Sequence, residues 1–577
     1  MRSWKRWRMK SAQFSIRVVA LALLMAAVLV EGLSFRAAAL RKKLIATGWD
    51  KADPARLREN LAEMEKRPFD GVVIELEGRS DANKKCPMRQ TFSSDSWRRE
   101  WFDSEVQKLK ECRFQRFSDN FITVGANPGN VDWFDDAGWR EIVAHWRIAA
   151  QLAREARFRG LLFDPEPYTK PWSQFAYAAQ VQRDQHSFDD YCVKARQRGR
   201  EVMSVLGAEY PDLTLFCYFM NSVVAAATGH ADPRPALAAS GYGLLPAFID
   251  GWLDSAPPTL TMVDGCESAY RYNSVEEYLE AAVRIKGACQ ELVAPENRAK
   301  YRAQVQVSFG IYLDAYWNPP TSPWYVDGEG TSRVERLGAN VATALRVADE
   351  YVWAYGEKFR WWPTPNKSVR EPSWDEALPG CEAALAFARN PLEWARGEIA
   401  ARKRAGQWQN LARNGNFGAD KVTVADGKVE TWKEGRPPAG WSTWQDDASH
   451  GRFTWDRETG AAAKGAARAA GVANGCFMQK FDVRPGEVYA VGAMRQLQGR
   501  GEATIRVRWQ TTEERWTAEG GDVMIFAEGP REEWRELFGV AEVPPGVGRM
   551  VILLSVRDQR WSDDVAWFDD VMVCKIK

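Results

Sequence analysis

Motifs of several common enzyme classes are missing from this 577-residue chain. It has only four histidines, no CxxC pair and no HExxH motif, which excludes a zinc ribbon, a zincin site and a thioredoxin-like redox site. Neither sign of charge is in excess, because 78 basic residues oppose 77 acidic ones. A balanced chain has no field that would hold a polyanion, so we predict no nucleic-acid partner.

The nine cysteines are irregularly spaced and odd in number. A chain of this length can bury a sufficient core without disulfides, so buried free thiols are the simpler expectation. Pairing of Cys86 with Cys112, or of Cys476 with Cys574, stays open for an oxidising compartment.

The chain has a single long hydrophobic run, Val18–Val30, directly after a start rich in basic residues. These 13 apolar residues are short for a membrane span, which needs about 20. Ala37-Ala38-Ala39 then offers an A-x-A cleavage site. We therefore predict a signal peptide over residues 1–39 and a secreted or periplasmic protein, with an uncleaved N-terminal anchor as the alternative.

Short apolar runs alternate with helical patterns from Lys43 onward, and this alternation predicts a (β/α)8 barrel over residues 40–408. The eight expected strands are Leu44–Thr47, Gly71–Leu76, Phe121–Val124, Gly160–Phe163, Leu213–Phe219, Thr259–Val263, Val305–Leu313 and Tyr351–Tyr355. Doubly wound sheets alternate in a similar way, so this prediction depends on the count of eight and on the residues at the strand ends.

Polar residues follow most of these strands, and parallel barrel strands bring their carboxyl ends to one mouth. They are Asp50, Glu75, Glu77, Asn127, Asp164, Glu166, Asn221, Asp264, Glu267, Asp314 and Glu357. Glycosidic-bond cleavage needs one acid to protonate the leaving oxygen and a second carboxylate to manage charge at the anomeric carbon. We therefore expect these residues to act in catalysis or in sugar binding.

Aromatic residues near the strand ends would hold the sugar rings, and Trp is unusually frequent, with 27 Trp against 16 Tyr. Tyr168, Trp317, Trp353, Tyr355 and Trp361 are the candidates, and alternation along the eighth strand places Trp353, Tyr355 and Glu357 on one face. A core role is the competing interpretation for each Trp.

The fourth strand carries the sharpest pattern, Asp164-Pro-Glu166-Pro-Tyr168. Residues two apart on an extended strand share a face, so Asp164 and Glu166 would lie close together. Neighbouring carboxylates repel when both are ionised, which raises one pKa and keeps a proton available near neutral pH. One of the two carboxyls is therefore expected to act as a proton donor.

This segment is similar to the D-x-x-D-x-D-x-E signature of chitinase-like family 18 glycoside hydrolases, with Asp164 and Glu166 at its last two acidic positions. Leu162 and Arg159 occupy the earlier ones, and Met262-Val263-Asp264 looks like the family's M-x-Y-D with Val in place of Tyr. The resemblance implies that Glu166 is the acid and that Asp164 orients the substrate's acetamido group.

Two other barrel chemistries compete with that assignment. Some α-glycosidase barrels place an Asp nucleophile after strand four and an Asp acid on strand six, positions that Asp164 and Asp264 match. The clan with Glu on strands four and seven fits poorly, because the seventh strand ends in Asp314. The sequence leaves open whether hydrolysis is retaining or inverting.

The pattern changes near Asn410 to short alternating strands with Gly and Pro between them, which predicts an all-β sandwich over residues 409–577. Its opening Asn410–Phe417 and its closing Trp567–Val571 resemble a CenC-type carbohydrate-binding module, a jelly roll. Such modules often hold a structural calcium. Gly418 stands where an acid is expected, which leaves Asn416 and Asp570 as candidate calcium ligands.

The sequence therefore predicts an exported glycoside hydrolase that acts on a polysaccharide or oligosaccharide and carries a carbohydrate-binding module. No cofactor is expected beyond the calcium. The alternative is a non-catalytic polysaccharide-binding protein with a degenerate barrel.

Overall fold

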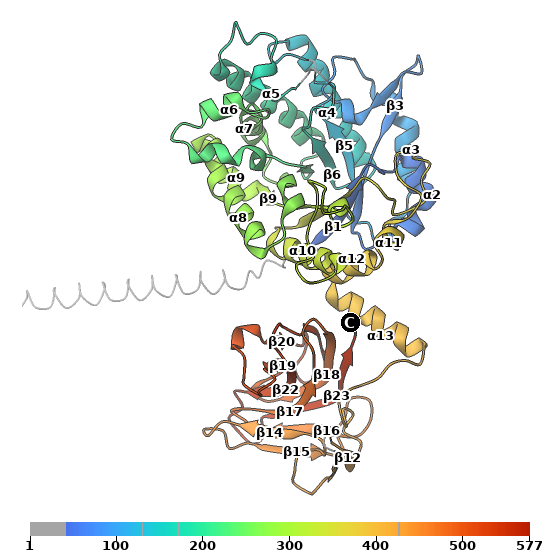
Figure 1. Cartoon of the computed structure of the whole chain (residues 1–577), viewed down its shortest axis with the longest axis vertical. Coiled ribbons are helices and arrows are strands. Elements are labelled where there is room, and N and C mark those ends of the chain that lie inside the picture. Colours follow the sequence, from blue (N-terminus) through green and yellow to red (C-terminus); the bar gives the residue numbers. More distant parts are fainter. Residues whose placement is uncertain (1–41, 130, 170–172, 425–426) are drawn as a thin grey trace, which may run out of the picture. The chain divides into compact units, whose positions relative to one another are not determined.

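The computed structural model describes residues 42–129, 131–169, 173–424 and 427–577 (Figure 1). The expected signal peptide lies outside these residues. No helix in the described part of the chain has both the length and the apolar character to cross a membrane. The chain divides into two compact units, one ending at Arg389 and the other formed by Asn390–Lys577.

The first unit is built on a nearly closed sheet of nine strands in the order β10-β11-β1-β2-β5-β6-β7-β8-β9, and its neighbouring strands run parallel. The strands are β1 (Lys43–Gly48), β2 (Gly71–Ile74), β5 (Phe121–Gly125), β6 (Gly160–Asp164), β7 (Thr214–Cys217), β8 (Thr261–Asp264), β9 (Val305–Val307), β10 (Phe309–Tyr312) and β11 (Tyr351–Gly356).

All eight predicted strand positions contain strands of this sheet. The expected strand at Val305–Leu313 is interrupted at Ser308, where its pairing changes from β8 to β11. Because only Ser308 separates β9 from β10, the two ends of the sheet order are joined along the chain, and the sheet curves almost into a closed barrel.

Helices follow the strands and cover the sheet. They are α2 (Pro54–Met64), α3 (Asp103–Glu111), α4 (Asp136–Glu155), α5 (Phe188–Glu209), α6 (Arg234–Ala239), α7 (Leu245–Ser255), α8 (Val275–Lys286), α9 (Arg298–Gln304), α10 (Arg333–Val347), α11 (Trp374–Ala377) and α12 (Cys381–Arg389). Local sequence explains where several of them begin. Capping boxes start α5 at Ser187, α8 at Ser274 and α10 at Ser332, where each serine caps the third backbone N–H.

Aromatic side chains fill the inside of the sheet and support the strand ends. Phe121 packs edge-on against Phe216 and Tyr351, with ring centroids 5.5 and 5.8 Å away. Two residues further along β11, Trp353 stacks on Tyr218 at 4.6 Å. These layers close the inside of the barrel sheet below the residues that follow the strands.

The second unit contains two five-stranded antiparallel sheets, β14-β17-β22-β19-β20 and β15-β16-β23-β18-β21. Residues of both sheets, such as Phe477 and Phe568, belong to one hydrophobic core. The strands are β14 (Ser442–Gln445), β15 (Arg452–Asp456), β16 (Ala466–Ala470), β17 (Asn474–Asp482), β18 (Val488–Gln498), β19 (Glu502–Gln510), β20 (Val523–Ile525), β21 (Arg535–Glu542), β22 (Arg549–Arg557) and β23 (Val565–Lys575), with a separate hairpin of β12 (Lys421–Thr423) and β13 (Val429–Thr431).

Helix α13 (Pro391–Arg404) groups with this second unit, whereas the sequence assigned it to the barrel. Its Arg402 donates to the carbonyl oxygens of Lys575 and Ile576, and Arg396 pairs with Glu536 of β21. These contacts explain why the division falls between Arg389 and Asn390. All nine cysteines are free thiols, so neither of the two candidate disulfides is formed.

Candidate functional site

The segment after β6 brings the two acids of the D-x-E pattern together. The Tyr168 hydroxyl lies 3.0 Å from Asp164 Oδ2 and 2.5 Å from Glu166 Oε2, so it contacts both carboxylates. Asp164 Oδ1 also accepts the Glu166 backbone N–H at 3.0 Å. Pro165 and Pro167 keep this segment out of a helix, and the two acids are neighbours as the spacing predicts.

Asn127, which follows β5, holds this segment in place. Its side-chain amide donates to the Glu166 carbonyl oxygen at 2.9 Å, and its Oδ1 accepts the Tyr168 backbone N–H at 2.9 Å. Asn127 is buried. Both polar groups of its amide are used by the peptide chain, so Asn127 positions the two acids.

Burial and neighbouring carboxylates raise the pKa of several carboxyl groups in this region. Burial and the nearby charge of Glu166 raise the pKa of Asp164 to about 7. Burial, Glu166 and Asp164 raise the pKa of Glu267 to about 8. Glu267 begins the short helix η5 (Glu267–Arg271) after β8, so two acids that keep a proton near neutral pH come from different strand ends.

Glu357, the residue after β11, completes the group. Burial raises its pKa, and the charges of Asp314 and Glu166 add to the effect. The phenol of Tyr355 on β11 has a raised pKa through burial and through all four carboxyls, Glu357, Asp164, Glu267 and Glu166. We call Asp164, Glu166, Glu267 and Glu357 the mouth carboxyls.

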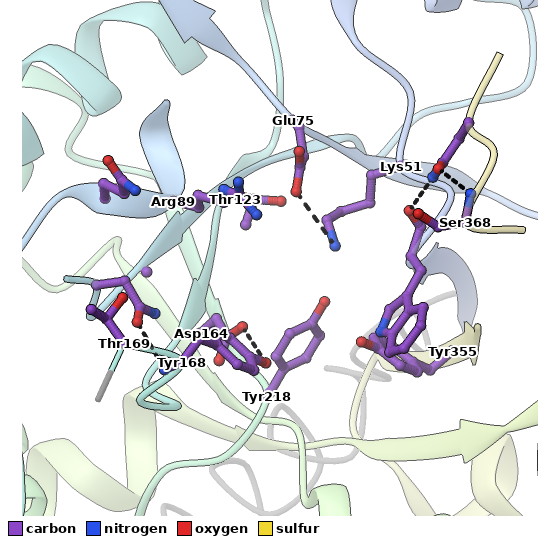
Figure 2. A pocket seen from close by; sticks show the side chains of 15 residues that line it. Lys51, Glu75, Arg89, Thr123, Asp164, Tyr168, Thr169, Tyr218, Tyr355 and Ser368 are labelled. Carbon is purple, nitrogen blue, oxygen red and sulfur yellow. Dashed lines mark hydrogen bonds and ion pairs between the residues drawn. The ribbon is translucent and has the colours of Figure 1, made fainter. Parts of the chain in front are cut away.

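A cavity of about 530 Å³ opens beside them (Figure 2). Glu75, Asn127, Asp164, Tyr168 and Tyr355 were expected in the site and all line this cavity. Glu166, Glu267 and Glu357 are not among its lining residues and act on Asp164 or Tyr355 from beside it.

Several lining residues were not expected from the sequence. Trp49 and Lys51 follow β1, Arg89 lies in the short helix η1 (Met88–Gln90), and Tyr218 follows β7. Trp49 is 53% exposed, which leaves its ring free to contact a ligand. The sequence signal was present in Trp49-Asp50-Lys51 after the first strand, but a search for acids passes over its aromatic and basic members.

Asp264, an expected catalytic residue, is fully buried and does not line the cavity. Its oxygens accept the backbone N–H groups of Met220, Ser222 and Cys266, at 3.0 to 3.2 Å, and the Ser222 hydroxyl at 2.5 Å. These bonds satisfy the carboxylate and join the ends of β7 and β8. Asp264 is placed to position the loop rather than to react.

Four other expected polar residues also lie outside the cavity lining. Asp314 is fully buried and accepts the Glu357 backbone N–H at 2.8 Å, so it positions a mouth carboxyl. Asn221 is fully buried, and neither atom of its amide has a hydrogen-bond partner among the described residues. Glu77 pairs with Arg79 and Lys85 on the hairpin of β3 (Glu77–Arg79) and β4 (Lys85–Pro87), while Asp50 pairs with Arg56.

The three expected Trp residues of the barrel are placed differently from one another. Trp353 is fully buried and donates its indole N–H to the Gly265 carbonyl oxygen at 2.9 Å, and Trp361 packs edge-on against Phe69. Both are core residues. Trp317 is partly exposed and lines a separate open groove together with Arg370, whose guanidinium lies over its ring.

The second unit shows exposed aromatic side chains. Trp444 on β14, Trp516 and Trp561 are about half exposed or more, whereas Trp441 and Trp509 are core residues. Of the two candidate calcium ligands, Asn416 Oδ1 accepts the Gly418 N–H, and Asp570 is exposed. Among the described residues, no group of three or more His, Cys, Asp or Glu side chains is arranged to hold a metal.

Comparison with known proteins adds little. No family model matches the chain and no curated protein matches it, so the resemblance to family 18 is not supported.

Similar solved structures include the CBM22-1–GH10 modules of xylanase 10B from Clostridium thermocellum, with 15% identity, 23% of this chain and 26% of that chain covered, and a TM-score of 0.20. TmCBM61 in complex with β-1,4-galactotriose matches with 15% identity over 29% of this chain and 99% of its own, also at a TM-score of 0.20. The enzymatically active domain of tailspike protein 4 from bacteriophage CBA120 has 15% identity over 24% of this chain and 19% of its own, again at 0.20. Likeness at this level carries no argument about function.

Proposed function

We propose that the chain is an exported glycoside hydrolase in which a (β/α)8 barrel, residues 40–408, cleaves a polysaccharide or oligosaccharide. A jelly-roll module, residues 409–577, would attach the enzyme to the glycan through exposed aromatic residues such as Trp444. One observation carries the proposal: carboxyls at the ends of three barrel strands have raised pKa values beside an open cavity with an exposed Trp in its wall.

The chemistry requires a carboxyl group that is still protonated at neutral pH. Glu267, with a pKa of about 8, meets this requirement and joins Glu166 as a candidate proton donor to the glycosidic oxygen. The remaining mouth carboxyls would stabilise positive charge at the anomeric carbon while water completes the hydrolysis. Tyr168 holds Asp164 and Glu166 in place for this step.

The test separates the two candidate donors. Hydrolysis of a panel of neutral and acidic oligosaccharides is measured for the full chain and for Glu166→Gln and Glu267→Gln, with Glu77→Gln on the β3–β4 hairpin as the matched control. We expect the control to hydrolyse at the normal rate. The variant that lacks the proton donor should lose about 10²- to 10⁴-fold on natural glycans.

A dinitrophenyl glycoside identifies the role of each residue, because its leaving group needs no protonation. The donor variant should recover activity on this substrate, whereas a variant that lacks the charge-stabilising carboxylate should not. Full activity in both Gln variants would remove the mouth carboxyls from the mechanism. Glycan binding without hydrolysis by the unmodified chain would instead assign a non-catalytic polysaccharide-binding protein.

A further inference from the structure

The cavity beside the mouth carboxyls contains two cationic side chains that the proposed hydrolysis does not use. Lys51 and Arg89 both line it, and in Figure 2 the Lys51 ammonium points toward its middle. Glycosidic cleavage requires acidic groups and aromatic surfaces that hold sugar rings, and it does not require a lysine or an arginine in the cavity.

The Lys51 ammonium is only partly satisfied by the protein. It donates to the Gly48 carbonyl oxygen at 2.7 Å, and its nearest carboxylate oxygen, in Glu75, is 3.9 Å away, beyond hydrogen-bond distance. An ammonium carries three donors, so two are left for another partner. Burial lowers the pKa of Lys51, and the charge of Arg89 acts in the same direction.

Arg89 has five N–H donors, and none of them forms a hydrogen bond or ion pair within the described residues. The residues close to it on either side are nevertheless held in place. The Met88 N–H donates to the Leu76 carbonyl oxygen at 2.9 Å, and the Thr91 hydroxyl donates to that of Gly125 at 2.9 Å. The position from which the Arg89 side chain reaches into the cavity is therefore fixed.

The acids of the cavity offset these two cations only in part, since the Lys51–Glu75 ion pair is long, at 3.9 Å, and no carboxylate pairs with Arg89 among the described residues. The pKa of Asp164 is raised to about 7, so this carboxyl is partly neutral near that pH, and its oxygens already accept from Glu166 and Tyr168. Glu75 is about half exposed to solvent. Two cations that face one cavity repel each other, and the buried Lys51 also loses hydration, so a bound anion would offset both costs.

We propose that the cavity takes the acidic group of an anionic sugar unit, a carboxylate or a sulfate, between Lys51 Nζ and the Arg89 guanidinium. This inference rests on the proposed hydrolase function and names its substrate class. A guanidinium suits both oxyanions because it donates two parallel N–H bonds to either. The exposed ring of Trp49 lines the same cavity and offers a platform for the sugar.

Binding is measured calorimetrically on the full chain with three probes: a neutral tetrasaccharide, an oligogalacturonide of the same length and a sulfated galactan oligosaccharide. We expect at least one acidic probe to bind about tenfold more tightly than the neutral one, and added salt to reduce that preference. The two acidic probes separate a carboxylate site from a sulfate site.

Arg89→Gln and Lys51→Gln should each remove most of the preference for acidic probes, measured within each variant as the ratio of acidic-probe to neutral-probe affinity. Arg79→Gln, on the neighbouring hairpin and paired with Glu77, is the matched control and should retain it. Equal binding of all three probes, or a preference that survives Arg89→Gln, would overturn the inference.

These results are independent of the test of hydrolysis. Cleavage of neutral glycans without any preference for acidic probes would refute the anion site and keep the hydrolase. An Arg89-dependent preference in a chain that cleaves nothing would keep the anion site and refute the hydrolase.

Discussion

Carboxylates at the two ends of the barrel sheet have opposite surroundings. At the amino ends of the strands, Lys43 lies 2.8 Å from both Asp119 and Glu350, and Tyr351 donates to Asp119 at 2.8 Å. At the carboxyl ends, burial and neighbouring carboxylates raise the pKa values of Asp164, Glu267 and Glu357. Buried acids with a cation among them stabilise a fold, whereas buried acids that crowd one another retain protons for chemistry.

The largest expected change in activity comes from a substitution at the carboxyl ends of the strands. Glu267→Gln removes the acid with the highest raised carboxyl pKa, about 8, and should lower hydrolysis of natural glycans by about 10²- to 10⁴-fold. The variant should be at least as resistant to urea as the unmodified chain at about pH 7, because Glu267 must take up a proton on folding at that pH and a glutamine need not. Loss of both activity and folding would mean that Glu267 belongs with the structural acids.

Lys43→Met tests the amino ends of the strands, where Lys43 pairs with two acids. It leaves the buried Asp119 and Glu350 without their shared cation and should lower the free energy of unfolding by about 3 kcal/mol. Urea denaturation measures this change, with Lys85→Met on the exposed β3–β4 hairpin as the control. Hydrolysis per folded molecule should stay normal, and a large loss there would contradict the separation of the two ends.

The pH dependence of stability should differ between the ends. Glu267 has its pKa raised from 4.5 to about 8 on folding, so it binds its proton more tightly in the folded chain. Its contribution is fully present below pH 4.5 and is lost as the pH rises through about 8. We expect the difference in unfolding free energy between about pH 5 and about pH 9 to shrink in Glu267→Gln. An unchanged difference would count against the raised pKa.

The smallest effect is expected from Glu77, which the sequence grouped with the mouth acids. Its partners Arg79 and Lys85 are exposed, so Glu77→Gln should change the free energy of unfolding by less than about 0.5 kcal/mol. Thermal denaturation measures this change. A shift as large as that of Lys43→Met would show that the hairpin supports the barrel.

Much of the site can be predicted from local sequence. The spacing of Asp164 and Glu166 predicts neighbouring acids, and strand ends predict that Asn127, Tyr355 and Glu75 meet at one place, as they do in the cavity lining. The roles of Asp264 and Trp353 could not be predicted, because a strand-end position does not reveal whether a side chain faces a cavity or packs beneath it. Asp264 is satisfied by donors from the preceding strand's loop, which no local pattern shows.

The amino-acid sequence by itself determined the alternation of eight strand positions with helices and the change to short β-strands in the second unit, because periodicity and turn residues are local properties. Tertiary structure alone decided which charges meet. Lys51 and Arg89 share a cavity and Lys43 joins two acids only because a curved sheet brings distant strand ends together. Burial then sets the pKa of each group by its neighbours in space rather than by its neighbours along the chain.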